Sequence, residues 1–139
     1  MKVVDQNKAF IFQYYHAISG HPKPRKLLEQ FITDPLLISY ILTVEKILPA
    51  YEDTIDEMTG EQDRIIVRST MHGKSGTDSQ YGTVQHRHVE FPVAIGYFIS
   101  NKKIVDHWMI SDHLSMLEQL GWLPEFEIDF SPNHKANES

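Results

Sequence analysis

Three side chains that can exchange protons alternate along one predicted strand. His86, His88 and Glu90 are each two residues apart. Successive side chains of a strand point to opposite faces, so these three share a face. An exposed polar stripe explains this pattern simply, because His and Glu are mostly surface residues. Two His and one carboxylate are also suitable metal ligands, but the same spacing arises on any polar strand face, so we expect no metal.

Asp112 is a further candidate for proton transfer. It directly precedes the segment His113 to Leu117, where an Asp is well placed to cap a helix. On an apolar wall its pKa would instead be raised by desolvation. A general base of that kind could remove a proton α to a carbonyl and then protonate the product oxyanion. The sequence leaves both roles open.

A long hairpin must position these groups. The segment from residue 83 to 100 is rich in β-branched and aromatic residues, as strands are. Asn101-Lys102 can form a two-residue turn because Asn tolerates positive φ. In that register Tyr97 faces Asp106 and Ile95 faces Trp108. The bulkier, more apolar face is expected to point inward, and it carries Phe91, Val93, Ile95, Tyr97, Ile104, Asp106, Trp108, Ile110 and Asp112.

Pro92 interrupts this strand and predicts a bulge. Proline cannot donate to a ladder, and a bulge swaps the faces of the residues beyond it. A bulge near Pro92 would turn His86 and His88 towards Asp112. We therefore predict a catalytic group of Asp112, His88 and His86, in which a His acts as proton partner or oxyanion donor.

The rest of the chain predicts helices first and strands afterwards. The first helix is expected between Asp5, as its cap, and Gly20, and a short helix follows Pro24. Asp34-Pro35 resembles the cap and first residue of a third helix, which Pro49 ends. In the first helix Ile11, Tyr14, Tyr15 and Ile18 lie along one side. They either pack in the core or turn a Tyr14 or Tyr15 hydroxyl into a cavity.

The pattern changes to strands after residue 50. Tyr51 to Thr59 has weak strand character, Ile65 to His72 is a stronger strand, and Lys74 to Gly82 reads as a loop. Acidic and apolar residues alternate from Glu125 to Phe130, which suits an edge strand or a strand lent to a partner. The order of elements predicts an α+β fold.

Composition narrows the class of protein. The 139 residues suggest one domain over residues 1–122, with a tail over 123–139. A net charge of −6 argues against a nucleic-acid partner. No apolar stretch has transmembrane length, and no signal-peptide pattern is present, so we expect a cytoplasmic protein. The absence of cysteine excludes disulfides and a Cys nucleophile.

Several motifs connect the chain with a known family. They are Gly60 to Arg68, His72-Gly73, Lys103-Ile104-Val105-Asp106-His107-Trp108, Asp112 and Leu117 to Gly121. With them the chain resembles the SnoaL-like polyketide cyclases of the nuclear transport factor 2-like superfamily, over roughly Asn7 to Trp122. The family pattern has Glu where this chain has Asp106, and a Gly in the hairpin turn.

The resemblance implies a cone: a curled mixed sheet packed on three N-terminal helices, with an internal pocket. It also implies that Asp112 acts as acid and base in an intramolecular aldol ring closure without a cofactor. The alternative is a non-catalytic ligand-binding or assembly module of the same fold. A small apolar molecule is the expected ligand, bound by Trp108, Tyr97, Tyr14 and His72. A homodimer through the outer sheet face is expected, because Ala94, Phe98, Val105 and Met109 should form an apolar patch there.

Overall fold

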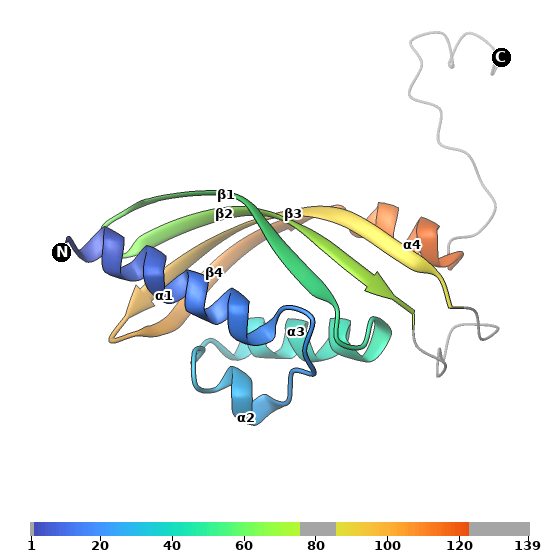
Figure 1. Cartoon of the computed structure of the whole chain (residues 1–139), viewed down its shortest axis with the longest axis horizontal. Coiled ribbons are helices and arrows are strands. Elements are labelled where there is room, and N and C mark those ends of the chain that lie inside the picture. The colour runs from blue at the N-terminus through green and yellow to red at the C-terminus, as the bar shows by residue number, and fades with distance from the viewer. Residues whose placement is uncertain (1, 76–85, 123–139) are drawn as a thin grey trace, which may run out of the picture.

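The computed structural model describes residues 2–75 and 86–122 and has an α+β architecture. Three helices come first, four antiparallel strands follow in the order β1-β2-β3-β4, and a short helix comes last. The sheet curls over the N-terminal helices (Figure 1). The elements are α1 (Val3–Ile18), α2 (Arg25–Leu28), α3 (Pro35–Ile47), β1 (Glu52–Glu61), β2 (Arg64–Lys74), β3 (His88–Ser100), β4 (Lys103–Ser111) and α4 (His113–Leu120).

The helices begin and end mostly where the sequence predicts. Asp34 caps α3 by accepting hydrogen bonds from the backbone N–H groups of Leu36 and Leu37, and Pro35 occupies the first turn. Ile11, Tyr14, Tyr15 and Ile18 are all buried on α1. The prediction that Asp5 caps α1 is wrong, because the helix already begins at Val3 and Asp5 lies in its first turn. Its negative charge there still interacts favourably with the positive end of the helix dipole.

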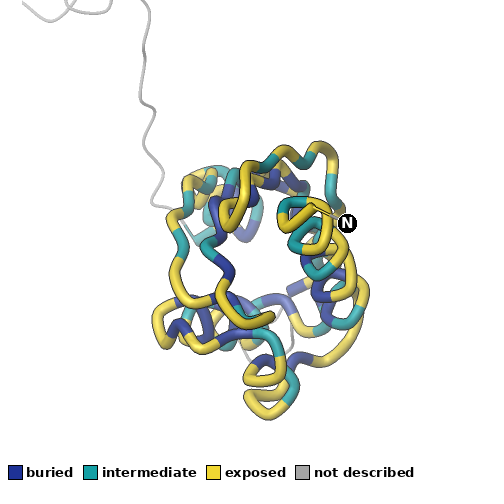
Figure 2. Tube along the Cα trace, turned by 90° about the vertical axis from the view of Figure 1, so that its left-hand side faces the viewer, coloured by how far each residue is buried: buried dark blue, intermediate teal, exposed yellow. Residues whose placement is uncertain are grey.

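The curled sheet and the helices surround a common interior. Viewed along the long axis, the chain forms a ring whose buried residues lie towards the inside (Figure 2). The inner face of β2 and β3 is formed mainly by apolar side chains such as Ile65, Val67, Phe91 and Ile95. A parallel bridge between Ile32 and Ile104 joins the segment before α3 to the free edge of β4. No helix in the described ranges is long and apolar enough to cross a membrane.

The hairpin between β3 and β4 has the predicted turn but a different register. Asn101 and Lys102 both have positive φ, 51° and 57°, and Ile99 pairs with Ile104 as predicted. The next pair is Phe98 with Asp106, so Val105 is an extra residue on β4. This bulge reverses the faces of β4 beyond it. The inner face of the sheet therefore carries His107, Met109 and Ser111 of β4. The outer face carries Asp106, Trp108 and Ile110, contrary to the prediction.

The predicted bulge at Pro92 is absent. The ladder between β2 and β3 runs without a shift from Arg64–Phe98, through Thr70–Pro92, to Lys74–His88. Pro92 lies opposite Thr70, and its missing N–H does not disturb the register. Its carbonyl accepts a hydrogen bond from the backbone N–H of Asp112. His88 and Glu90 therefore stay on the outer face, opposite to buried Val89 and Phe91.

Helix α4 closes the edge of β3 that β4 leaves open. The side-chain amide of Gln119 accepts from the backbone N–H of Glu90 at 2.8 Å and donates to its carbonyl at 2.7 Å. These are the two hydrogen bonds that a paired strand would supply. Gly121 then ends α4 with φ of 74°, the left-handed conformation of a typical helix C-terminus. The Gln-Leu-Gly motif thus has a structural basis, since Leu120 between them is buried.

Candidate functional site

Asp112 caps a helix in this structure. Its Oδ1 accepts a hydrogen bond of 3.0 Å from the backbone N–H of Ser115, and the residue is exposed. Among the described residues no hydrogen bond or ion pair joins it to His86 or His88. The capping role is therefore shown, whereas the catalytic role of Asp112 stays a prediction.

Two of the three predicted histidines line an open cleft of about 530 Å³. His72 and His88 line it together with Glu52, Lys74 and Glu90, so it carries charges of both signs. His72 Nδ1 lies 3.8 Å from Glu90 Oε2, which is a long ion-pair distance between exposed groups. His86 is exposed and its Nδ1 contacts the backbone oxygen of Ser75 at 3.2 Å. The absence of the Pro92 bulge explains why these residues do not meet Asp112.

Trp108 lies outside the expected pocket. The bulge at Val105 turns it to the outer face, where it pairs with Gly96 and is 41% exposed. Its indole covers Gly96 so closely that a Cβ at this position would collide with it. The prediction that Trp108 binds substrate inside the cone is thus wrong in its placement. Tyr97 and Tyr14, by contrast, are buried on the inner side as predicted.

A half-buried carboxyl group beside the interior cavity belongs to Asp53, which is not among the residues predicted from the sequence. Asp53 lies near the start of β1, and its Oδ1 is buried without a hydrogen-bond partner among the described residues. Burial raises its pKa from 3.8 to about 6, although the neighbouring Ser69 hydroxyl and the Lys23 ammonium favour the charged form. At neutral pH such a carboxylate is a base with an oxygen free to accept a proton.

A cluster of tyrosines surrounds this carboxyl group. Tyr14, Tyr40, Tyr51 and Tyr97 line, together with Asp53, an enclosed cavity of about 20 Å³. That volume holds about one water molecule. Burial raises the pKa of Tyr40 to about 12 and those of the other three further above the ordinary value. All four phenols therefore remain hydrogen-bond donors at neutral pH.

Two of the phenol groups are directly linked. The hydroxyls of Tyr15 and Tyr97 lie 2.6 Å apart, and both side chains are buried. In such a pair one hydroxyl donates to the other, so the accepting hydroxyl keeps its own proton for a third group. The pair can therefore offer one further hydrogen bond to a neighbouring oxygen atom.

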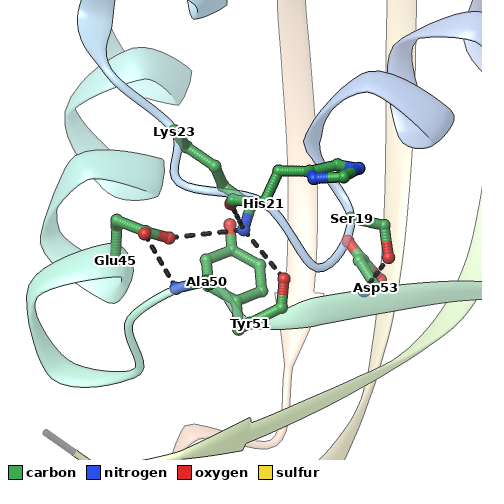
Figure 3. Close-up of polar contacts among 7 residues, drawn as sticks. All are labelled: Ser19, His21, Lys23, Glu45, Ala50, Tyr51 and Asp53. Atoms are coloured by element: carbon green, nitrogen blue, oxygen red, sulfur yellow. Dashed lines mark hydrogen bonds and ion pairs between the residues drawn. The ribbon is translucent and has the colours of Figure 1, made fainter.

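Lys23 holds the start of β1 in place. Its buried ammonium group donates to the carbonyl oxygens of His21 at 2.9 Å and Tyr51 at 2.8 Å, and it pairs with Glu45 Oε2 at 3.3 Å (Figure 3). It also lies 3.8 Å from the centre of the Tyr51 ring. Burial lowers the pKa of Lys23, while Glu45 opposes that shift. With all three protons engaged, Lys23 is a positioning group rather than a nucleophile.

The same network fixes the backbone of Asp53. Glu45 Oε1 accepts from the backbone N–H of Ala50 at 2.8 Å, which anchors the turn that leads into β1. The hydroxyl of Ser19 accepts from the backbone N–H of Asp53 at 2.9 Å, and Figure 3 shows the two residues together. The end of α1, the end of α3 and the start of β1 therefore meet at one polar junction beside the carboxyl group.

One signal in the sequence could have identified Asp53. Tyr51, Asp53 and Ile55 alternate, so an acid shares its strand face with two large apolar residues. A carboxylate on such a face needs a partner or has a raised pKa. The weak strand character of this segment hid the pattern, because Glu52, Thr54 and Asp56 make the other face wholly polar.

A second cluster has the residue types of a cation site. Asp34, Asp106 and His107 offer potential ligand atoms within 4.8 Å of one another. The oxygens of Asp34 are already used, however: Oδ1 caps α3 and Oδ2 contacts His107 Nδ1 at 2.5 Å. This cluster therefore joins β4 to α3. Both oxygens of Asp34 already have partners, so they need no cation.

The raised pKa of Asp53 predicts a pH-dependent stability. Between 3.8 and about 6 the folded protein keeps a proton that the unfolded chain has lost, so stability falls as pH rises through this window. Asp53→Asn should remove this cost, which amounts to roughly 3 kcal/mol at neutral pH. We expect the variant to gain stability relative to wild type at pH 7.5, and the gain to disappear near pH 4. Urea unfolding across this range measures it; a pH-independent difference would contradict the raised pKa.

Comparison with known proteins finds similarity to SnoaL-like polyketide cyclases, both in sequence and in structure. The sequence pattern of a family described as "SnoaL-like polyketide cyclase" matches residues 41–120. A crystal structure of a candidate SnoaL-like polyketide cyclase from Jannaschia sp. CCS1 has a TM-score of 0.72 at 13% identity, over 89% of this chain and 97% of that chain. No match is found among curated proteins.

Two further solved structures are similar. A candidate polyketide cyclase from Acidithiobacillus ferrooxidans has a TM-score of 0.72 at 14% identity, over 87% of this chain and 98% of that chain. A SnoaL-like polyketide cyclase from Agrobacterium tumefaciens has a TM-score of 0.64 at 15% identity, over 83% and 98%. At such identities the structural likeness shows the fold alone.

Proposed function

Since this chain belongs to the SnoaL-like polyketide cyclase family, we propose that it is a cofactor-free acid/base enzyme acting on a small, largely apolar carbonyl compound. In this proposal Asp53 transfers the proton. The observation that supports it is a half-buried carboxylate whose Oδ1 is buried without a partner among the described residues, with a pKa raised to about 6 and tyrosines beside it. Asp112, by comparison, is exposed and bonded to a helix amide.

The chemistry would begin with the Asp53 carboxylate taking a proton from the carbon next to the substrate carbonyl. The electron pair of that C–H bond then moves onto the carbonyl oxygen, and an enolate forms. A phenol proton of the Tyr15–Tyr97 pair would stabilise this oxygen. The enolate carbon could attack a second carbonyl of the same molecule, and the proton held by Asp53 would neutralise the new alkoxide. Return of the proton to carbon at another position would give isomerisation instead.

Proton exchange on a simple ketone tests this proposal without knowledge of the natural substrate. The test ketone is 2-tetralone, a neutral bicyclic compound with acidic α-protons, in D₂O. We expect the protein to accelerate incorporation of deuterium, with a rate that rises with pH and levels off above an apparent pKa of about 6. NMR follows the loss of the α-proton signals. A rate equal to that in buffer alone would count against general-base catalysis.

A non-catalytic ligand-binding module is the alternative. The cavity of about 20 Å³ has no room for a carbonyl substrate inside the ring, which speaks against catalysis there. In that case Asp53 would bind a hydrogen-bond donor of the ligand and would not exchange protons with carbon. Tight binding without any deuterium exchange on tetralone would support this alternative.

We also propose a homodimer through the outer sheet face. The bulge at Val105 changes the predicted patch: Met109 turns inward, while Trp108 and Ile110 join Ile66 outside with exposures of 41%, 71% and 41%. Such a patch commonly marks an interaction surface. Light scattering at micromolar concentration should give about twice the chain mass of 16.1 kDa. Ile110→Lys should give a monomer, and a monomeric wild type would refute the dimer.

A further inference from the structure

We propose that the ligand reaches Asp53 through a groove between α1 and β1, and that it is a neutral, planar molecule with a hydroxyl or carbonyl group at its leading edge. This inference rests on the proposed role of Asp53. The groove has a volume of about 470 Å³ and is lined by Phe12, Tyr15, His16, Ser19, Asp53 and Ile55. The groove is shallow and largely open to solvent.

The walls of the groove follow from the periodicity of the two elements. Phe12, Tyr15, His16 and Ser19 are spaced so that they form one stripe along α1. Asp53 and Ile55 are two residues apart on β1 and face the helix together. The hydrogen bond between the Ser19 hydroxyl and the backbone N–H of Asp53 joins the two walls at one end. The groove therefore leads along α1 to the polar junction at the start of β1.

Asp53 connects this groove with the interior. It lines both the groove and the enclosed cavity of the tyrosine cluster. Tyr15 lines the groove and Tyr97 lines the cavity, and their hydroxyls lie 2.6 Å apart. A molecule in the groove would thus lie against Asp53 and Tyr15 without entering the cavity. The groove therefore has room for a ligand that the cavity of about 20 Å³ does not have.

The lining indicates the class of ligand. Phe12 is 55% exposed and Ile55 is half-buried, so apolar surface is available on both walls. Aromatic side chains offer flat faces on which a planar ring can stack. Asp53 is the one acidic residue of the lining, and its carboxylate would repel an anion while accepting a hydrogen bond from a hydroxyl group. His16 at the surface adds positive charge only when protonated.

Two probes of equal shape and different charge separate this ligand class from others. 2-Naphthol is neutral and carries a hydroxyl group, whereas 2-naphthoate is an anion on the same ring system. We expect 2-naphthol to shift the backbone NMR signals of the groove residues at pH 7.5 and to bind at least about tenfold more tightly than 2-naphthoate. Asp53→Asn should reduce this preference, since it removes the negative charge.

A pair of Trp variants tests the position. Ile55→Trp should fill the groove and weaken 2-naphthol binding at least about tenfold. Thr54→Trp is the control, because it is the next residue of the same strand and points to the other face. Equal binding by wild type and Ile55→Trp, or equal loss in both variants, would overturn the groove. Signal shifts confined to the cleft of His72 and Glu90 would also overturn it.

The two proposals fail in different ways. Groove binding of 2-naphthol with no deuterium exchange on tetralone would leave the groove standing and remove catalysis by Asp53. Exchange that Ile55→Trp does not slow would leave Asp53 as a base and remove the groove as its entrance. Melting curves of both Trp variants identify any loss of binding that comes from unfolding.

Discussion

Asp53→Asn is expected to lower the protein-catalysed exchange of α-protons by about 10²–10⁴-fold, the range over which general acid–base groups act. Asparagine has the size of aspartate but cannot take up a proton at neutral pH. The side chain would keep its place on the inner face of β1, because Ser19 holds the backbone and not the carboxyl group. Lost exchange should accompany raised stability at neutral pH, and a merely structural residue would not show both effects.

Asp112→Asn is the matched control for this experiment. Asn caps helices about as well as Asp, so the hydrogen bond to Ser115 should persist and stability should change little. Exchange rates should stay within about twofold of wild type if Asp53 is the base. If Asp112→Asn instead loses exchange while Asp53→Asn retains it, the sequence-based assignment is right and ours is wrong.

Of all the proposed substitutions, Lys23→Met is expected to destabilise the protein most, lowering the free energy of unfolding by about 3 kcal/mol. Methionine fills a similar volume but leaves the carbonyl oxygens of His21 and Tyr51 without their donor. Glu45 loses its partner, although it is 18% exposed and keeps the backbone N–H of Ala50, which moderates the cost. Urea denaturation of the variant measures the loss.

The same substitution should change the acidity of Asp53. The Lys23 ammonium lowers the pKa of this carboxyl group, so its removal should raise the pKa further above 6. Carbon-detected NMR titration of the Asp53 side chain gives this value directly. Lys26→Met, at an exposed position of α2, should change neither stability nor the Asp53 pKa. An unchanged Asp53 pKa in a folded Lys23→Met variant would show that the charge is too well screened to act.

Local signals were enough to predict most of the fold. The Asp34-Pro35 cap, the buried stripe of α1 and the Asn101-Lys102 turn each depend on residues within a few positions of one another. Each of these signals depends on the residue types within one turn, and these can be read directly from the sequence. The alternating segment from Glu125 to Phe130 lies outside the described residues, so its predicted strand stays a prediction.

The site could not be predicted because it depends on single-residue shifts in pairing. The extra residue Val105 has no marker in the sequence, since any residue can occupy a bulge of this kind. Pro92, which does look like a marker, leaves the ladder intact. The missed bulge at Val105 placed Asp106 and Trp108 inside and His107 outside. The wrongly predicted bulge at Pro92 turned His86 and His88 towards Asp112. Asp53 was missed for another reason, because Lys23 and Ser69, which lower its pKa, come from distant parts of the chain.

The contact between Gln119 and Glu90 has a consequence for how the protein behaves in concentrated solution. An unpaired strand edge is a template on which another chain can add and start an aggregate. Here a side-chain amide already occupies both bonding groups of Glu90, and Ser115 holds the amide at 2.8 Å. Helix α4 therefore protects this stretch of β3 against strand addition while it leaves the face of the sheet free.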